Sequence, residues 1–508
     1  MADIILSTLN ARFIHAALGL RCLQANLGEL QPRSRLIEFD ISQRPVEIAE
    51  AILREHPRIL GLGISIWNVA PTTELTAILK QLRPTLIVNL GGPELQSSPE
   101  QHPITALADF VISGEADLEF ARLCRRLLAG DKPATRILMA EPPDLARLVL
   151  PYRLYTPADI EHRLIYVEAS RGCPFRCEFC LSSTDAPLRF FPQPKLFEEF
   201  QWLLDQGVRH FKFVDRTFNL NLETALAVLR FFLDRCQPGL FLHFEMIPDR
   251  LPDELGRLIA RFPPGALQFE IGIQTFNPEV ARRIQRHQDY ALLERHFQFL
   301  RRHTHAHLHA DLIVGLPGET LESIARGFDR LVALQPQEIQ VGLLKRLRGA
   351  PIARHDGEWQ MTYNPWPPYE ILENRLIDFG SMQRLRRFAR YWDLVANSGR
   401  FPETTPLLWT TNPSPFQAFL LWSDWLYAQI GRQHSIALVR LAELLFRFLV
   451  QETRQDPSVV GPALWRDLAR GQNKTMPGFL QAHAPANGAS SAPRPSSMSP
   501  KRQSRHEP

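Results

Sequence analysis

The 508-residue sequence has no apolar run of eighteen residues, so it predicts no membrane-spanning helix. Its first ten residues, MADIILSTLN, carry an acidic side chain and no Lys or Arg, which makes them a poor secretory signal. Cysteine is scarce, with six residues in all, and three of the six fall within eight positions. This distribution is unlike a disulfide framework and suits a reducing compartment. We therefore expect a cytoplasmic protein without a membrane partner.

The sequence also lacks a strong net charge, which is +4 at neutral pH. Of the 58 basic residues only 7 are Lys, and an Arg bias of this kind does not by itself indicate phosphate binding. No nucleic-acid partner is therefore expected. The length predicts two or three domains, and no internal repeat is present.

Residues 1–140 alternate short apolar runs with amphipathic stretches, which predicts a parallel sheet covered by helices on both faces. The apolar runs are DIILST, RLIEFDI, ILGLGISI, TLIVNLGG and DFVISG. Ligands of such doubly wound domains bind beyond the carboxyl ends of the strands. The candidate binding residues at those ends are Asn10, His15, Gly91, Gly92, Pro93, Gly114 and Glu115. For the glycines, a tight turn without a ligand is an equally good explanation.

A proline-rich linker, residues 141–162, precedes a second α/β region over residues 163–348. Its six strand patterns are LIYVEAS, HFKFVD, LFLHFEM, LQFEIGIQ, LHADLIVGLP and EIQVGLL. Six βα units in series predict a partial (β/α)6 barrel, whose chemistry is expected at the carboxyl ends of its strands. Residues 349–480 predict a helical C-terminal domain that holds seven of the nine Trp residues, and residues 481–508 predict a disordered tail.

The stretch EASRGCPFRCEFCLSS follows the first barrel strand and contains Cys173, Cys177 and Cys180. Iron–sulfur clusters are held by Cys thiolates, usually four, so three leave one iron of a four-iron cluster open to a ligand. The spacing differs from that of ferredoxins, which disfavours simple electron transfer. A structural zinc site completed by a distant His, or a cysteine-rich loop without metal, is the alternative explanation.

The segment RGCPFRCEFC resembles the cluster loop of the radical S-adenosylmethionine enzymes. DLIVGLPGET and FEIGIQTFNPEVARRIQR resemble the fifth and fourth barrel strands of that family. FKFVDRTFNLN resembles the second strand, where many members carry Gly-Gly-Glu instead. The resemblance implies a [4Fe-4S] cluster on Cys173, Cys177 and Cys180. S-adenosylmethionine would bind the open iron, and its reductive cleavage would give a 5′-deoxyadenosyl radical.

The N-terminal segments NLGGPEL and DFVISGEADLEF resemble the cobalamin-binding domain that precedes this barrel in one class of the family. The Asp-x-His-x-x-Gly motif, which brings a cobalt-binding His in many such domains, is missing, and the first loop reads NARFIHAALG with His15. The C-terminal region, with YEIL and NSGRF, resembles a domain of unknown function from a subgroup. The resemblance thus implies cobalamin as a further cofactor.

Four polar residues near barrel strand ends are candidate cofactor ligands, although an ordinary buried hydrogen-bond network would explain each equally well: Asp215, Glu245, Glu270 and Gln274. The segment HTHAHLHAD contains four His residues, and we expect no metal site there, although His309 and Asp311 can line the barrel. Cys22, Cys124 and Cys236 are expected to be buried free thiols.

These observations favour a cobalamin-dependent radical S-adenosylmethionine enzyme that transfers a methyl or other group to an unactivated carbon of a small molecule. It would need an electron donor such as flavodoxin or ferredoxin. Two alternatives stay open. One is a radical enzyme without functional cobalamin that performs a rearrangement, ring closure or oxidation. The other is a non-catalytic iron–sulfur or cobalamin sensor.

Overall fold

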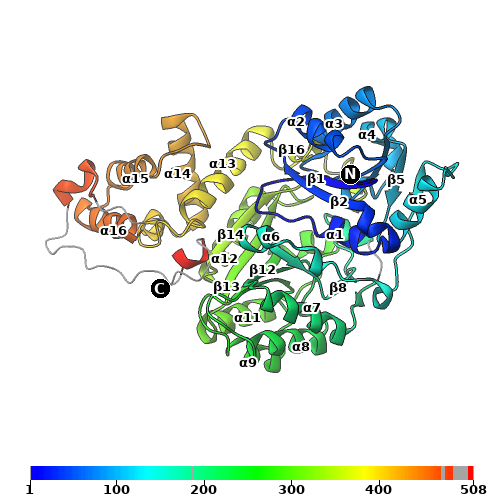
Figure 1. Cartoon of the computed structure of the whole chain (residues 1–508). Coiled ribbons are helices and arrows are strands. Elements are labelled where there is room, and N and C mark those ends of the chain that lie inside the picture. The colour runs from blue at the N-terminus through cyan, green and yellow to red at the C-terminus, as the bar shows by residue number, and fades with distance from the viewer. Residues whose placement is uncertain (1, 185–186, 471–474, 484–501, 507–508) are drawn as a thin grey trace. The chain divides into compact units, whose positions relative to one another are not determined.

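The computed structural model describes residues 2–184, 187–470, 475–483 and 502–506 (Figure 1). Among these residues, no helix combines the length and the apolar character that crossing a membrane requires. Two compact units are formed. Unit 1 comprises Met1–Arg216, Lys345–Arg354 and Asn364–Glu370, and unit 2 comprises Thr217–Leu344, His355–Tyr363 and Ile371–Pro508. The chain thus returns to unit 1 twice after the last strand of its second sheet.

The first sheet contains six parallel strands in the order β2-β1-β3-β4-β5-β6. These strands are β1 (Ile4–Asn10), β2 (Ser34–Asp40), β3 (Ile59–Gly63), β4 (Ile87–Gly91), β5 (Phe110–Ser113) and β6 (Ile137–Met139). The helices between them are α1 (Leu18–Ala25), α2 (Pro45–Arg54), α3 (Val69–Leu82), α4 (Pro103–Leu107) and α5 (Glu119–Leu128). The predicted doubly wound domain is therefore confirmed, and β6 is a strand that the apolar pattern did not indicate.

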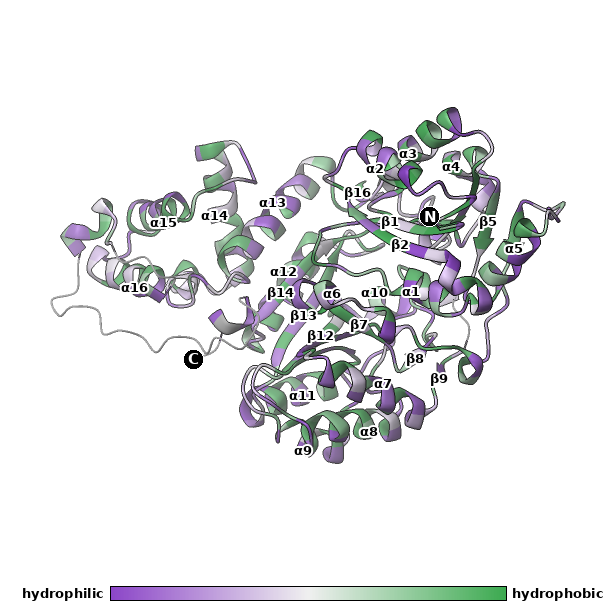
Figure 2. Cartoon of the chain, in the orientation of Figure 1, coloured by the Kyte–Doolittle hydropathy of each residue, from purple (hydrophilic) through white to green (hydrophobic). Residues whose placement is uncertain are grey.

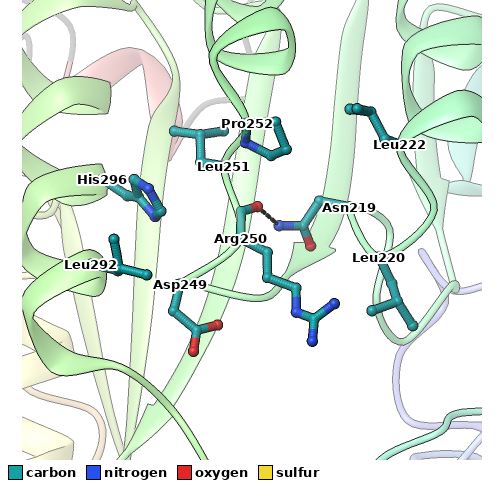
Figure 3. Close-up of a pocket in the computed structure, with 9 residues that line it drawn as sticks. All are labelled: Asn219, Leu220, Leu222, Asp249, Arg250, Leu251, Pro252, Leu292 and His296. Atoms are coloured by element: carbon teal, nitrogen blue, oxygen red, sulfur yellow. Dashed lines mark hydrogen bonds between the residues drawn. The ribbon is translucent and has the colours of Figure 1, made fainter.

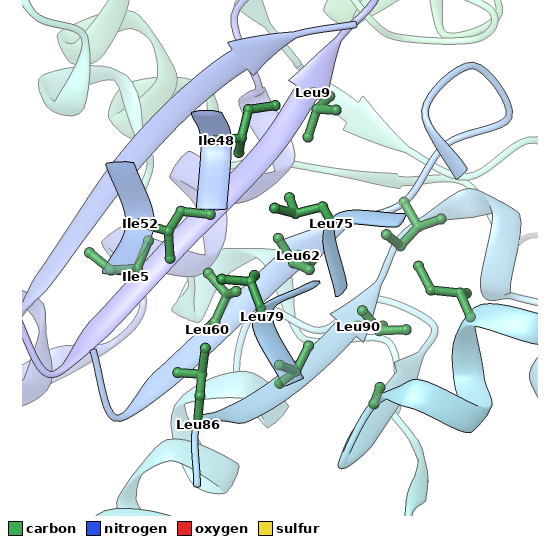
Figure 4. Close-up of a cluster of buried hydrophobic side chains, with 14 of the residues drawn as sticks. Ile5, Leu9, Ile48, Ile52, Leu60, Leu62, Leu75, Leu79, Leu86 and Leu90 are labelled. Carbon is green, nitrogen blue, oxygen red and sulfur yellow. The ribbon is translucent and has the colours of Figure 1, made fainter. Parts of the chain in front are cut away.

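Each face of this sheet packs against its own set of helices. Ile5, Leu60 and Leu62 point from β1 and β3 toward Ile48 and Leu79 of α2 and α3 (Figure 4). The other face buries alternate residues of the same strands against α1 and α5. Because side chains alternate between the two faces of a strand, both faces can be dry only if nearly every residue is apolar. This is why the inner strands β3, β4 and β5 read as nearly continuous apolar runs, whereas the edge strand β2, SRLIEFD, is mixed. Figure 2 shows the hydrophobic β5 beside helices of mixed character.

The second sheet is also parallel, with the strand order β14-β13-β12-β11-β10-β7. Its strands are β7 (Ile165–Val167), β10 (His210–Phe213), β11 (Phe241–Met246), β12 (Leu267–Gln274), β13 (His307–Val314) and β14 (Glu338–Leu343). The accompanying helices are α6 (Pro157–His162), α7 (Gln193–Asp205), α8 (Leu222–Leu233), α9 (Asp253–Ile259), α10 (Pro278–Arg283), α11 (Tyr290–His303) and α12 (Leu321–Ala333). Six strands that follow one another in sequence order without closing confirm the predicted partial barrel.

The C-terminal region is helical, as predicted, and its tryptophans form a core. Its helices are α13 (Phe379–Val395), α14 (Pro415–Ile430), α15 (Leu438–Arg447) and α16 (Pro457–Arg470). Trp392 and Trp422 are buried, and the Trp392 ring lies 4.7 Å from Phe328 and 4.9 Å from Phe419 between ring centroids. These indoles pack against other aromatic side chains. In contrast, Trp366 is 74% exposed.

Two short antiparallel pairs were not predicted: β8 (Ser170–Arg171) with β9 (Arg189–Phe190), and β15 (Thr362–Tyr363) with β16 (Ile371–Glu373). Most of the predicted disordered tail lies outside the described residues. Its described parts include the end of a 3-10 helix at Gly478–His483 and a second 3-10 helix at Gln503–Arg505.

Candidate cofactor site

The cysteine loop begins where the first barrel strand ends. Strand β7 is followed by Ser170–Arg171 and then by Gly172, whose φ of +93° requires a residue without a Cβ. The Cys180 amide donates to the Cys177 carbonyl at 3.1 Å, which closes a tight turn between these two cysteines. Cys173 and Cys177 are buried and Cys180 is partly exposed. The loop therefore places three cysteine sulfurs at the end of the first barrel strand, the predicted catalytic edge.

This donor set suits a polynuclear cluster. Across the part of the chain that the structure describes, no three His, Cys, Asp or Glu side chains are grouped as a single metal ion would need. A four-iron cluster has no such need, because each cysteine binds a different iron atom. Three thiolates from one short loop are the type of ligand that iron–sulfur clusters use. In the His-rich segment, the His307 and His309 ring nitrogens lie 3.1 and 3.6 Å from the Glu338 carboxylate.

Arg171 joins the cysteine loop to the first sheet. Its guanidinium donates to both carboxylate oxygens of Glu168 at 2.7 and 3.0 Å, and to both of Asp117 at 2.8 and 3.1 Å. It also donates to Glu115 at 3.2 Å, and its Nη2 lies 3.6 Å from the Cys22 sulfur. Burial raises the pKa of Glu168, and the positive charge of Arg171 opposes that rise. One cation therefore compensates three carboxylates immediately before the first cluster cysteine.

Asp215 supports the same strand end from a neighbouring strand. Its carboxylate accepts hydrogen bonds from the Ala169 amide at 3.0 Å and from the Ser170 hydroxyl. Burial raises the pKa of Asp215 to about 6, while these hydrogen bonds oppose the rise. The side chain thus holds the backbone that leads into the cysteine loop. Ordinary hydrogen bonding, the alternative that the sequence left open for this residue, accounts for these contacts.

The predicted ligand-binding residues of residues 1–140 gather at one edge of the first sheet. The Asn10 amide donates to the His15 carbonyl at 2.9 Å and to Glu38 at 3.0 Å. The His15 ring nitrogen Nδ1 lies 2.7 Å from the Tyr166 hydroxyl. Burial lowers the pKa of His15, and the charges of Lys212 and Arg12 lower it further. The lowered pKa favours the neutral form of His15, and its ring is already hydrogen-bonded to Tyr166.

Backbone geometry explains why glycine is required at two of the three glycine positions at this edge. Gly92 has a φ of +119°, and a Cβ there would lie 2.4 Å from the Ile64 carbonyl oxygen. Gly114 has a φ of +96°, and its Cβ would lie 2.7 Å from the Ala140 carbonyl oxygen. A Cβ at Gly91 would meet only the Ile112 carbonyl at 3.4 Å. Tight turns thus explain Gly92 and Gly114 without a ligand, whereas Gly91 leaves room at the strand end.

Exposed apolar side chains lie at this edge, within the strand-end ranges 10–15 and 65–68 that the sequence indicates. Trp67 is 49% exposed in the loop after β3, and its indole N–H donates to the Leu9 carbonyl at 3.2 Å. Phe13 and Ile14, in the loop after β1, are also exposed. A large aromatic residue in a strand-end loop was the available signal, because such loops carry ligands in doubly wound folds.

Three further candidate residues lie on neighbouring strands of unit 2. Glu245 of β11 pairs in register with Glu270 of β12, which pairs with His309 of β13. Gln274 ends β12 beyond a register shift after Gly272, and its φ of +72° is in the left-handed region, so alternation along the strand does not fix its face. The His243 ring nitrogen Nε2 is 3.0 Å from the Glu270 carboxylate. Glu245 and Glu270 therefore lie side by side in the sheet, and the role of Glu245, Glu270 and Gln274 as cofactor ligands stays a prediction.

A shallow pocket of about 370 Å³ lies beyond the ends of strands in unit 2 (Figure 3). Asn219 fixes one wall, since its side chain bonds the Ile247 amide at 2.8 Å and the Arg250 carbonyl at 2.5 Å. Leu292 and His296 of α11 form the opposite wall. Sequence reasoning missed this pocket, because its lining comes from three separate segments.

Three family models match separate segments of the chain. Residues 6–124 match the B12 binding domain, residues 167–331 the radical SAM superfamily, and residues 357–493 a protein family of unknown function, DUF4080. The chain thus contains a B12 binding domain, a radical SAM superfamily domain and a C-terminal domain of unknown function, in that order.

Two curated relatives are methyltransferases. The 2-(S-pantetheinyl)-carbapenam-3-carboxylate methyltransferase of Streptantibioticus cattleyicolor is 27% identical over 206 residues, which cover 34% of this chain and 30% of that protein. The cobalamin-dependent radical SAM methyltransferase TokK of Streptomyces tokunonensis is 25% identical over 348 residues, which cover 60% of this chain and 49% of that protein. The chain therefore spans less than half the length of either relative.

Two solved structures share the architecture. The radical S-adenosylmethionine methyltransferase TsrM of Kitasatospora setae aligns with a TM-score of 0.58 at 16% identity, over 74% of this chain and 80% of that one. The cobalamin-dependent S-adenosylmethionine radical enzyme OxsB aligns with a TM-score of 0.61 at 12% identity, over 94% of this chain and 85% of that one. At these identities the likeness concerns the fold.

Proposed function

We propose that this protein is a cobalamin-dependent radical S-adenosylmethionine methyltransferase that acts on an unactivated carbon of a small molecule. The observation that carries the proposal is the position of the cysteine loop. It lies in the same compact unit as the edge of the B12-binding domain, and Arg171 binds side chains of both. Methyl transfer to a substrate radical requires the methyl donor and the radical source to be close together.

When bound, the cofactors would supply a hydrogen-abstracting radical and a methyl donor, and the protein would supply their placement and the exclusion of water. Cys173, Cys177 and Cys180 would hold the [4Fe-4S] cluster, and Arg171 and Asp215 would fix the loop that carries them. Glu245, Glu270 and Gln274 are proposed to hydrogen-bond S-adenosylmethionine. The strand-end loops around Gly91 and Trp67 are proposed to hold cobalamin, and no His ligand to cobalt is proposed.

Replacement of the three cysteines by Ala tests the cluster assignment. Anaerobically purified wild-type protein is expected to carry about four iron and four sulfide per chain. The triple variant is expected to lose both, together with the cluster's visible absorbance. Retention of iron and sulfide at wild-type levels would show that the cluster is held elsewhere.

Equilibrium dialysis against hydroxocobalamin separates this proposal from its alternatives. Binding is expected for protein that is folded and carries its cluster. No binding would favour a radical enzyme without cobalamin. Cobalamin binding without any cleavage of S-adenosylmethionine by the reduced protein would favour a sensor. We also propose that the enzyme works in a reducing cytoplasm with flavodoxin or ferredoxin as electron donor, because reductive cleavage of S-adenosylmethionine needs an electron from outside the protein.

A further inference from the structure

Two segments that follow the last barrel strand belong to unit 1: residues 345–354 and residues 364–370. They pair with each other. Lys345 and Glu370 form an antiparallel bridge, and the Arg346 amide donates to the Tyr369 carbonyl at 3.0 Å. We call this pair of segments the strap. None of the functions considered above uses it.

One end of the strap holds a loop of the B12-binding domain. Glu94, directly after Gly91-Gly92-Pro93, is only 4% exposed. Its Oε1 accepts from the Tyr369 hydroxyl at 2.7 Å and lies 3.5 Å from Arg348 Nε, and His102 approaches the same oxygen at 3.3 Å. A Cβ on Gly349, whose φ is +83°, would lie 2.5 Å from the Ser97 Cβ, so the two backbones are in close contact.

The other end of the strap holds the cysteine loop. Glu178 stands between two cluster cysteines and is fully buried. Its backbone carbonyl accepts from the Ile352 amide at 2.9 Å, and its carboxylate forms an ion pair with Arg354. Ile352 is itself fully buried, which anchors this end of the strap.

We infer that the strap couples the cobalamin site to the cluster site, with Arg348 and Arg354 as positioning residues. Each binds a buried carboxylate, and each carboxylate belongs to a different cofactor loop. A buried carboxylate that loses its cation is strongly destabilised, so each loop depends on the position of the strap. A displacement at one end must therefore alter the loop at the other. This inference rests on the proposed function, because it concerns the same two cofactors.

Each substitution is made at one end of the strap, and its effect is measured at the cofactor site of the other end. Arg354→Gln disturbs the cluster end, and it is expected to weaken hydroxocobalamin binding by about five-fold or more in equilibrium dialysis. Arg348→Gln disturbs the Glu94 end, and it is expected to change the electron paramagnetic resonance spectrum of the reduced cluster with S-adenosylmethionine added. The matched control is Lys345→Gln, which removes one positive charge from the same strap and is expected to change neither quantity.

Iron and sulfide contents are measured for every variant. If Arg354→Gln loses its cluster, the double variant Glu178→Gln with Arg354→Gln replaces it, because it removes the buried charge together with its partner. The inference is overturned if cobalamin affinity stays within about two-fold of wild type and Arg348→Gln leaves the cluster spectrum unchanged. Wild-type protein that carries its cluster but binds no cobalamin would instead overturn the proposed function. In that case the electron paramagnetic resonance spectrum of Arg348→Gln alone would test the coupling through the strap, and an unchanged spectrum would overturn it.

Discussion

Replacing Arg171 with Met should unfold the junction between the cysteine loop and the first sheet. The side chains of Glu168 and Asp117 are 7% and 6% exposed, and both lose a bidentate partner in this variant. Breaking a buried ion pair by removing one partner costs about 3–5 kcal/mol. The matched control is Arg189→Met, whose partner Glu115 is 24% exposed. That pair is partly hydrated, so its loss should cost no more than about 1 kcal/mol.

Chemical denaturation followed by circular dichroism measures the difference, and hydrogen exchange over residues 165–171 locates it. The deficit of Arg171→Met should shrink as the pH falls from 8 to 5.5. Burial raises the pKa of Glu168, and the variant removes the Arg171 charge that opposes this rise, so protonation of Glu168 relieves more of the deficit as the pH falls. Stability within about 1 kcal/mol of wild type at pH 8 would refute the assigned role of Arg171.

Three further predictions concern single residues. Burial raises the pKa of Glu319 from 4.5 to about 7, so wild-type stability should fall by up to about 3 kcal/mol as the pH rises from 4.5 past 7. The stability of Glu319→Gln, measured by thermal denaturation, should not show that fall. The same pH dependence of stability in wild type and Glu319→Gln would contradict the prediction. Gly92→Val should destabilise the protein, because a Cβ there would lie 2.4 Å from a carbonyl oxygen, whereas Gly91→Ala should be tolerated, because the same distance is 3.4 Å. Equal melting temperatures of the two variants would contradict this prediction. Trp67→Ala should weaken hydroxocobalamin binding about ten-fold at unchanged iron content, through loss of an exposed aromatic surface, and unchanged affinity would exclude the indole from the site.

The fold could be predicted because its determinants are local. Strands buried on both faces must be apolar throughout, and the helices between them must be amphipathic, so both signals stand in the sequence. The three cysteines were also recognisable, since their spacing within eight residues is itself the ligand pattern. Strand β6 was missed because it is only three residues long and one of them is exposed.

The polar contacts around the site could not be predicted, because they join residues far apart in the chain. Tyr369 and Glu94 are 275 positions apart, and Arg171 and Glu115 are 56 apart. No periodicity links such pairs. Glu115 was selected as a cofactor ligand from its place at a strand end, and the structure places its carboxylate on Arg171 and Arg189. The strand end was located correctly, and the direction of the side chain depended on contacts that only the folded chain shows.

The proposed methyl transfer is most directly tested by the products formed from S-adenosylmethionine. Anaerobic protein that carries both its cluster and cobalamin would be reduced and incubated with S-adenosylmethionine and the true substrate. That substrate would be sought as the small molecule whose mass changes when the gene is deleted. We expect methylated substrate, with both 5′-deoxyadenosine and S-adenosylhomocysteine formed in each turnover. Formation of 5′-deoxyadenosine alone, with substrate and cobalamin both present, would contradict methyl transfer and indicate a rearrangement, ring closure or oxidation.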